Sequence, residues 1–295
     1  MADAGTPPVV GVIGGSGVYE IDGLEDIVWR RIETPFGAPS DALMFGTLDG
    51  QQLVFLPRHG RGHLVPPSEL NFRANIDALK RAGCTEIISV SAVGSLKEEL
   101  TPGTFLIVDQ FIDRTFARKK SFFETGFVAH VSLADPVCSR LGNVLEAGAG
   151  TVGLDVVRGG TYIAIEGPQF STRAESELYR SWGCSVIGMT NMPEAKLARE
   201  AEMCYATVAM VTDYDCWHPH HEDVTVESII AVLLANADNA RALIRNTAPR
   251  LLDRTAPCDA GCHMALDNAI ITTPDARDPK IAAKLEAVAA RVLGE

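Results

Sequence analysis

The sequence predicts a single α/β domain with a central mixed β-sheet flanked by helices. Seven apolar runs recur along the chain, and helix-like segments separate some of them. Most of these runs are continuous rather than alternating, which is typical of strands that are covered on both faces. The chain of 295 residues is 46% hydrophobic and 22% charged, as expected for a globular protein that buries a sizeable core.

The elements follow from local signals. The predicted strands are, in chain order, 8–15, 52–58, 86–94, 104–111, 161–167, 184–190 and 204–213. Helices begin where a capping side chain or a proline precedes helical periodicity. The expected starts are Ser68 for a helix over 68–83, Asp135 with Pro136, Thr172 with Glu175 as a capping box, and Pro193 for a helix over 193–202.

The C-terminal part begins with a long helix from Thr225 to about Leu252. Its apolar stripe predicts packing against the body of the protein. The stripe consists of Val226, Ile229, Ile230, Val232, Leu233, Leu234 and Ala237. Loop-like stretches follow, and a short helix is expected over 280–293. We therefore expect a domain core over 9–253 and an extension with a terminal helix over 254–295.

The net charge of -12 argues against a general binder of nucleic acid or anionic membranes, because a negative field repels polyanions. The start "MADAGTPP" lacks the features of a secretory signal, and no apolar run reaches the length of a membrane span. We therefore expect a cytoplasmic protein without nucleic-acid or membrane partners. An anionic substrate would need a local basic pocket.

Two groups of residues could bind a metal ion, and each has an ordinary alternative. Cys258 and Cys262 are close in sequence, but no second thiol pair is near in sequence. Seven scattered cysteines favour reduced thiols over a disulfide framework. The stretch "HPHHED" at 218–223 contains proline and polar residues, which favours a solvated loop. We expect no metal site.

The first predicted strand runs into a glycine loop, "VVGVIGGSGVYE", at residues 9–20. The spacing is not that of a dinucleotide-binding loop, and no well-placed acidic residue follows about 20 residues later. Ser16 adds a hydroxyl among flexible backbone amides, a suitable donor set for an anion. The alternative is a tight turn without a ligand.

Further anion donors follow other predicted strands. Arg58 offers a planar fork of N–H donors that matches phosphate, and His59 adjoins it. Ser91 and Thr190 supply hydroxyls near the ends of two more strands. For Arg58 and His59, the ordinary alternative is a basic surface turn. For Thr190, it is a hydroxyl at the start of a helix. Because sites in α/β proteins lie at the carboxyl ends of strands, these groups are expected to meet.

Acidic and apolar groups at other strand ends suggest a site for an organic base. Asp213 and Asp215 follow a buried strand and project to one side. Two neighbouring carboxyls raise each other's pKa, so one of them can remain protonated and donate a hydrogen bond. Phe170 is either a stacking platform or a core residue. The alternative for the carboxyls is a solvated acidic turn.

Together and in order, several stretches resemble the purine nucleoside phosphorylase superfamily over residues 9 to about 250. They are "GVIGGSG", "TPFGAPSDAL", "RHGRGH", "NFRANIDALKRAGC", "GSLKEELTPG", "DQFIDRT", "EGPQFSTRAES", "MTNMPEAKLAREA" and "TDYDCW". The resemblance implies a phosphorylase-like α/β fold and a homotrimer, with pairing of trimers left open. It also implies cleavage of 5'-methylthioadenosine by inorganic phosphate, a co-substrate, to adenine and 5-methylthioribose 1-phosphate. No metal or organic cofactor is implied.

The resemblance also implies residue roles. Phosphate would be bound by Ser16, Arg58, His59, Ser91, the Ala92 amide and Thr190. The base and ribose would be lined by Phe170, Ile187 and Met189, with Asp213 and Asp215 on the purine. Val226 and Ile229 would face the methylthio group, and His130 would reach a neighbouring subunit's pocket. The catalytic set is Asp213, Asp215, Arg58 and His59. Asn191 stands where threonine is common.

Three other functions are alternatives. One is a phosphorylase for 6-oxopurine nucleosides or methylthioinosine, which the acidic pair disfavours because it should favour a 6-amino group. Another is a non-catalytic nucleotide-binding protein, which the glycine spacing disfavours. A nucleoside hydrolase would release the base without phosphate.

Overall fold

The structure is a computed structural model that describes residues 7–15, 17–218, 226–252, 254 and 256–293. For 226–231, 233 and 235 it describes the backbone only. Within these residues, eleven strands form one mixed sheet, which confirms the predicted mixed sheet but with more than the seven predicted strands. They are β1 Val9–Gly14, β2 Glu25–Arg30, β3 Leu43–Leu48, β4 Gln51–Pro57, β5 Cys84–Ser95, β6 Phe105–Ile107, β7 Gln110–Asp113, β8 Val156–Arg158, β9 Thr161–Ala164, β10 Val186–Gly188 and β11 Cys204–Asp213.

Strand β5 organises the sheet. Its partner β11 runs parallel to it from Cys204↔Glu86 to Asp213↔Gly94, so one edge of β5 is occupied along most of its length. The other edge is shared by two strands. β1 pairs in parallel up to Ile13↔Ser89, and β10 pairs antiparallel at Ile187↔Gly94. Residues 90–93 lie between these two pairings, where strand order changes and where α/β proteins place ligands.

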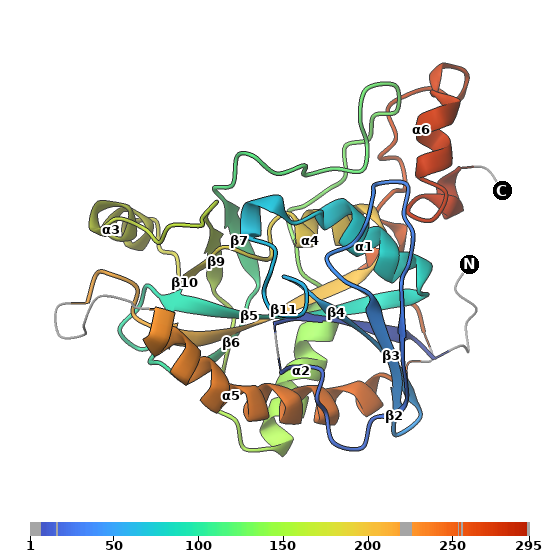
Figure 1. The fold of residues 1–295 in the computed structure, drawn as a ribbon. Coiled ribbons are helices and arrows are strands. Elements are labelled where there is room, and N and C mark those ends of the chain that lie inside the picture. The colour runs from blue at the N-terminus through green and yellow to red at the C-terminus, as the bar shows by residue number, and fades with distance from the viewer. Residues whose placement is uncertain (1–6, 16, 219–225, 253, 255, 294–295) are drawn as a thin grey trace.

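Helices cover both faces of the sheet (Figure 1). α1 Phe72–Arg81 and α4 Glu194–Glu200 pack on one face, and α2 Ser139–Thr151 and α5 Val226–Thr247 pack on the other. α3 Arg173–Ser181 lies beyond the β9 and β10 side of the sheet. Side chains of β11 alternate between the two core layers: Tyr205 and Ala209 join one, and Ala206 and Val208 join the other. Burial on both faces explains the continuous apolar runs.

Two helix starts differ from the sequence prediction. Ser68 lies in η1 Pro67–Glu69, and Asn71 caps α1 by accepting a hydrogen bond from the Ala74 amide. The Ser68 hydroxyl instead donates to the Glu166 carbonyl. α2 begins after Cys138 rather than at Asp135. Asn71 is a second good capping residue three positions after Ser68, whereas the cap of α2 is a thiol, Cys138 Sγ, which accepts from the Leu141 amide.

Other boundaries are confirmed or corrected. The Thr172–Glu175 capping box is present, and α4 begins directly after Pro193. The strand expected over 104–111 is divided into β6 and β7, which pair with different neighbours. The strands β2, β3 and β8 were not predicted. Leu234 of the expected apolar stripe is 70% exposed, so the buried face of α5 excludes it.

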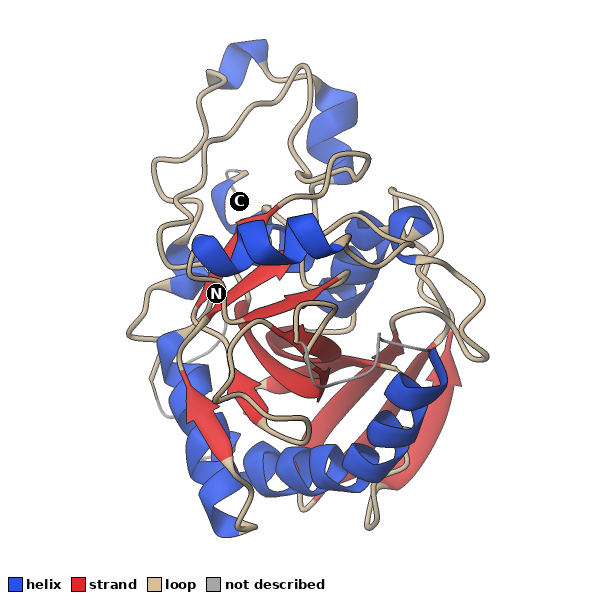
Figure 2. Cartoon of the chain, turned by 90° about the vertical axis from the view of Figure 1, so that its left-hand side faces the viewer, coloured by secondary structure: helices blue, strands red, loops and turns tan. Residues whose placement is uncertain are grey.

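The C-terminal segment packs on the body through short elements. They are η2 Ala248–Leu251, η3 Cys262–Met264, η4 Pro274–Ala276, α6 Pro279–Lys284 and η5 Ala290–Val292. The helix expected over 280–293 is thus broken after α6. Leu285 and Val288 still join the core layer beneath α1 and α4. Figure 2 shows the strands curving through the middle of the molecule with helices around them. None of the described helices is long and apolar enough to span a membrane.

Candidate active site

Arg58 follows β4 and forms the most buried ion pair near the predicted phosphate site. Its Nε donates to Glu194 Oε1 at 2.6 Å, and its Nη2 donates to Ser89 Oγ at 2.6 Å and Glu194 Oε2 at 3.2 Å. Nη1 donates to the Val90 carbonyl at 2.8 Å. Both partners of the ion pair are at most 2% exposed. These bonds leave one Nη1 hydrogen for another acceptor.

Glu194, which begins α4, was missed by the sequence analysis. Burial alone would raise the pKa of Glu194, but the charge and hydrogen bonds of Arg58 lower it, so the group is a carboxylate. The pair therefore presents little net positive charge. The only sequence signal is a glutamate in the first turn of a helix, and a glutamate there is ordinary because it complements the helix dipole.

Asn191 links the hydroxyls expected to bind phosphate. It is fully buried and has a positive φ of 69°. Its Oδ1 accepts hydrogen bonds from Ser91 Oγ at 3.0 Å and Thr190 Oγ1 at 2.8 Å. Its Nδ2 donates to Tyr205, Thr207 and Ser89. The side chain thus holds two hydroxyl oxygens from β5 and from the end of β10 at fixed positions.

His59 is a neutral ring with a defined tautomer. Its Nδ1 lies 2.8 Å from the Val65 carbonyl, which can only accept, so Nδ1 carries the hydrogen. Burial and the charge of Arg58 lower the pKa of His59 to about 4. The ring stacks on His63 at 4.2 Å. At neutral pH its Nε2 is therefore a hydrogen-bond acceptor.

Asp213 and Asp215 lie together at the end of β11. Asp213 Oδ1 accepts from the Asp215 amide at 2.8 Å, and Oδ2 accepts from Thr212 Oγ1 at 2.6 Å. Asp215 Oδ2 is buried and has no hydrogen-bond partner within the described part of the chain. Asp215 also has a positive φ of 52°. The two carboxyls thus have different surroundings.

Burial raises the pKa of both carboxyls, and the charge of Asp213 raises the pKa of Asp215 further. Two donors satisfy the Asp213 oxygens, which favours its ionised form. A proton shared by this pair would therefore reside on Asp215, because its Oδ2 has no hydrogen-bond partner among the described residues and the charge of Asp213 disfavours its ionised form.

Gly94 of β5 brings these carboxyls next to the predicted base-binding residues. A Cβ at this position would lie 2.9 Å from Asp213 Oδ1, 3.2 Å from Asp215 Cβ and 3.1 Å from Ile187 Cγ2. Similarly, a Cβ on Gly167 would lie 2.5 Å from Met189 Sδ. Ile187 is buried, while Met189 is half-buried. These close approaches join β5, β10 and β11 at one end of the sheet.

The remaining residues predicted for the site differ in burial, and some lie outside the described part of the chain. Ala92 is half-buried on β5, between Ser91 and Gly94. Phe170 is 47% exposed after β9, so it does not belong to the core. His130 is exposed, and its amide donates to the Ala269 carbonyl. Ser16 and the side chains of Val226 and Ile229 lie outside the described residues.

The two groups of candidate metal ligands have different surroundings in the structure. Of "HPHHED", His218 pairs with Glu98 at 3.0 Å, and 219–223 lie outside the described residues. Cys258 and Cys262, by contrast, have two further buried thiols beside them, those of Cys138 and Cys204. Sequence spacing gives no sign of this meeting, because the partners come from distant segments.

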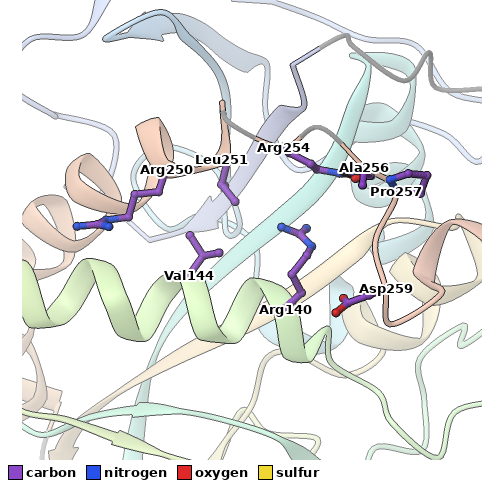
Figure 3. A pocket seen from close by; sticks show the side chains of 8 residues that line it. All are labelled: Arg140, Val144, Arg250, Leu251, Arg254, Ala256, Pro257 and Asp259. Carbon is purple, nitrogen blue, oxygen red and sulfur yellow. Dashed lines mark hydrogen bonds between the residues drawn. The ribbon is translucent and has the colours of Figure 1, made fainter.

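A basic pocket lies elsewhere on the molecule. Figure 3 shows it between α2 and the C-terminal segment, lined by Arg140, Val144, Arg250, Leu251, Arg254, Ala256, Pro257 and Asp259. Arg140 and Arg254 both pair with buried Glu86, at 2.6 and 2.8 Å. Since Glu86 faces Cys204 at the start of β11, this pocket lies at the opposite end of that strand from Asp213.

Comparisons with known proteins agree with this fold. The family described as the phosphorylase superfamily matches residues 9–248. An S-methyl-5'-thioadenosine phosphorylase of Rhodospirillum rubrum is 64% identical over 294 residues, covering 100% of both chains. A crystal structure of a methylthioadenosine phosphorylase from an antarctic soil metagenomic library has a TM-score of 0.89 and 46% identity, covering 96% of this chain and 99% of that one.

A third match includes a bound nucleoside. It is a mutant adenosine/methylthioadenosine phosphorylase of Schistosoma mansoni in complex with methylthioadenosine, at 33% identity and a TM-score of 0.79. The likeness covers 96% of this chain and 98% of that one.

Proposed function

The chain belongs to the phosphorylase superfamily, and we propose that it is a pentosyltransferase that cleaves 5'-methylthioadenosine with inorganic phosphate. The products are adenine and 5-methylthioribose 1-phosphate, so the reaction serves methionine and purine salvage. The observation that carries the proposal is the arrangement of two unlike groups at one end of the sheet. Hydroxyls held by Asn191 lie on one side, and the Asp213 and Asp215 carboxyls lie on the other.

The base side supplies a proton and an acceptor. Breaking the N-glycosidic bond places negative charge on the purine and positive charge on the sugar, as in glycoside hydrolysis. Protonated Asp215 donates to N7 of the departing base, and ionised Asp213 accepts from the 6-amino group. A 6-oxo group would leave that acceptor unpaired, at a cost of about 1–3 kcal/mol. The pair therefore favours adenine over 6-oxopurines.

The phosphate side positions the nucleophile. The Ala92 amide and the remaining Nη1 hydrogen of Arg58 donate to its oxygens. The Ser91 and Thr190 hydroxyls bind it when they turn their hydrogens from Asn191 Oδ1 to the phosphate oxygens. His59 Nε2 accepts the hydroxyl hydrogen of HPO₄²⁻ and so orients the molecule. Phosphate then stabilises the sugar cation and captures it at C1. Phosphate is itself the nucleophile, so the proposed reaction needs no metal or organic cofactor.

The assembly and location are part of the proposal. We propose a cytoplasmic homotrimer in which His130 reaches the pocket of a neighbouring subunit. The alternative assembly is a dimer of such trimers. The segment between β7 and α2 supports the trimer, because it exposes two residues that could contact another subunit. They are His130 and Phe116, which is 82% exposed. Light scattering of the purified protein tests the trimer. A monomer at micromolar concentration would contradict it.

One assay tests the function. Purified protein is incubated with methylthioadenosine, adenosine, methylthioinosine and inosine, with and without phosphate, and base release is followed by chromatography. Adenine release from methylthioadenosine that requires phosphate is the expected result. Preference for methylthioinosine would indicate the 6-oxo alternative, and release without phosphate would indicate a hydrolase. No turnover of any nucleoside would favour a binding protein.

A further inference from the structure

Four cysteine sulfurs meet in the interior, away from the active site. Cys138 precedes α2, Cys204 begins β11, and Cys258 and Cys262 belong to the C-terminal segment. All four residues are buried, and their sulfur atoms lie within 4.8 Å of one another. Asp213 is at the other end of β11, about 30 Å away for a strand of this length. The cluster therefore has no part in the proposed reaction.

The spacing of the sulfurs fits a tetrahedral metal ion. A Zn–S bond of about 2.3 Å gives an S–S edge of about 3.8 Å in a tetrahedron. Cys258 and Cys262 are 3.8 Å apart, and Cys138 and Cys258 are 3.5 Å apart. The separation of four positions between Cys258 and Cys262 also lies in the usual range for paired zinc ligands.

Positive groups and N–H donors surround the cluster as a thiolate site requires. The Leu141 amide donates to Cys138 Sγ at 3.5 Å. Arg140 Nη2 lies 3.6 Å from Cys204 Sγ, and Arg199 Nη1 lies 3.6 Å from Cys262 Sγ. Such donors orient thiolate ligands and stabilise their charge.

The charges balance a zinc tetrathiolate. Four thiolates with Zn²⁺ carry a net charge of -2. Arg140 and Arg199 contact the sulfurs, and Arg254 approaches through Glu86, which bonds to both Arg140 and Arg254. Three guanidinium groups and one carboxylate leave two positive charges to offset the cluster. Four neutral thiols would leave the Arg140 and Arg199 guanidinium groups beside sulfur atoms that carry no charge to pair with them.

We propose that Cys138, Cys204, Cys258 and Cys262 bind one Zn²⁺ ion as a structural tetrathiolate site. Binding releases four protons from the four thiols and forms four Zn–S bonds, with no change in oxidation state. The ion fastens the C-terminal segment to the start of β11 and to α2. Because such a site forms only in the folded chain, metal binding contributes directly to stability.

Metal analysis of the wild-type protein tests the proposal without any variant. The protein is purified without a metal-affinity step and under reducing conditions, and zinc is measured by mass spectrometry. One zinc per chain is expected, released when an organomercurial blocks the thiols. Protein without stoichiometric metal, or one in which these cysteines form disulfides under reducing purification, overturns the proposal.

A variant pair and metal replacement give a second test. The double variant Cys258→Ser with Cys262→Ser should lose the zinc, whereas Cys184→Ser, a buried thiol elsewhere, should retain it. Cobalt added to chelator-treated protein should give the visible absorption of a tetrahedral thiolate complex. Zinc retained by the double variant, or cobalt bound without that absorption, contradicts the site. These readouts are independent of activity on any nucleoside.

Discussion

Replacing Asp215 with asparagine tests the assignment of the proton donor. Asp215 has a φ of 52°, a conformation that asparagine adopts readily, so Asp215→Asn should fold without backbone strain. The amide still forms a hydrogen bond but cannot transfer a proton. General acid catalysis typically contributes about 10²–10⁴-fold, so we expect kcat to fall at least about 100-fold. This corresponds to about 3 kcal/mol in the activation barrier.

The pH dependence provides the second readout of the same variant. Burial and the charge of Asp213 raise the pKa of Asp215, so the acid form persists above the usual range of an aspartate. The wild-type rate should therefore fall as pH rises through this elevated pKa, because the donor loses its proton. The variant has no such proton, so this alkaline decline should disappear from its profile.

The assay measures adenine release from methylthioadenosine at saturating phosphate across pH. Asp49→Asn is a matched control, because Asp49 also has a positive φ, 47°, but lies in the exposed turn between β3 and β4. The control should retain wild-type kinetics. If Asp215→Asn loses less than about tenfold in kcat and keeps the wild-type pH profile, Asp215 is not the proton donor.

Three further predictions concern the groups around the site. Glu194→Gln leaves Arg58 as a buried unpaired charge, so the free energy of unfolding in urea should fall by about 3 kcal/mol, against less than about 1 kcal/mol for the exposed control Glu177→Gln. Equal losses would contradict the role of the ion pair. Gly94→Ala crowds Asp213 and Asp215, so the nucleoside KM should rise while the phosphate KM is unchanged. Gly150→Ala in α2, with open space around it, serves as its control, and parallel changes in both KM values would argue against the assignment. The pKa of His59 falls from 6.5 to about 4 on folding, so the unfolded state binds more protons in this range and stability should decrease by up to about 3 kcal/mol as pH drops through it. The free energy of unfolding should therefore fall more with acidification in wild type than in His59→Gln, which has no group to protonate at this position. An identical pH dependence of the two proteins would refute this.

Much of the fold could be predicted because its signals are local. The continuous apolar runs predicted β1, β4, β5, β9, β10 and β11. The strands β2, β3 and β8 were missed. β2 is largely exposed and β8 is short, so neither shows a long buried run. The Ser68 start was wrong because Asn71, three residues later, is also a good capping residue and caps α1 instead. The Asp135 start was wrong because α2 begins only after Cys138, a residue type that gives no capping signal.

The site was predicted in part for the same reason. The sequence made candidates of four residues because each follows or ends an apolar strand: Ser91, Thr190, Asp213 and Asp215. Their meeting was inferred from the rule for α/β sheets and from family resemblance, and the structure brings them to one end of the sheet. The hydrogen-bond partners and the protonation state of each group could not be predicted from the sequence. The Arg58 fork is largely used by Glu194, and the neutral tautomer of His59 depends on the Val65 carbonyl.

The sequence by itself determined which residue types stand at the ends of the strands, because strand periodicity and chain-breaking glycines act over a few residues. Only the tertiary structure decided which of these groups are charged, neutral or linked. Arg58 and Glu194 are 136 residues apart, and Cys138 and Cys258 are 120 residues apart. Contacts over such separations form when buried polar groups must find partners in a shared low-dielectric interior, and no local pattern records that outcome.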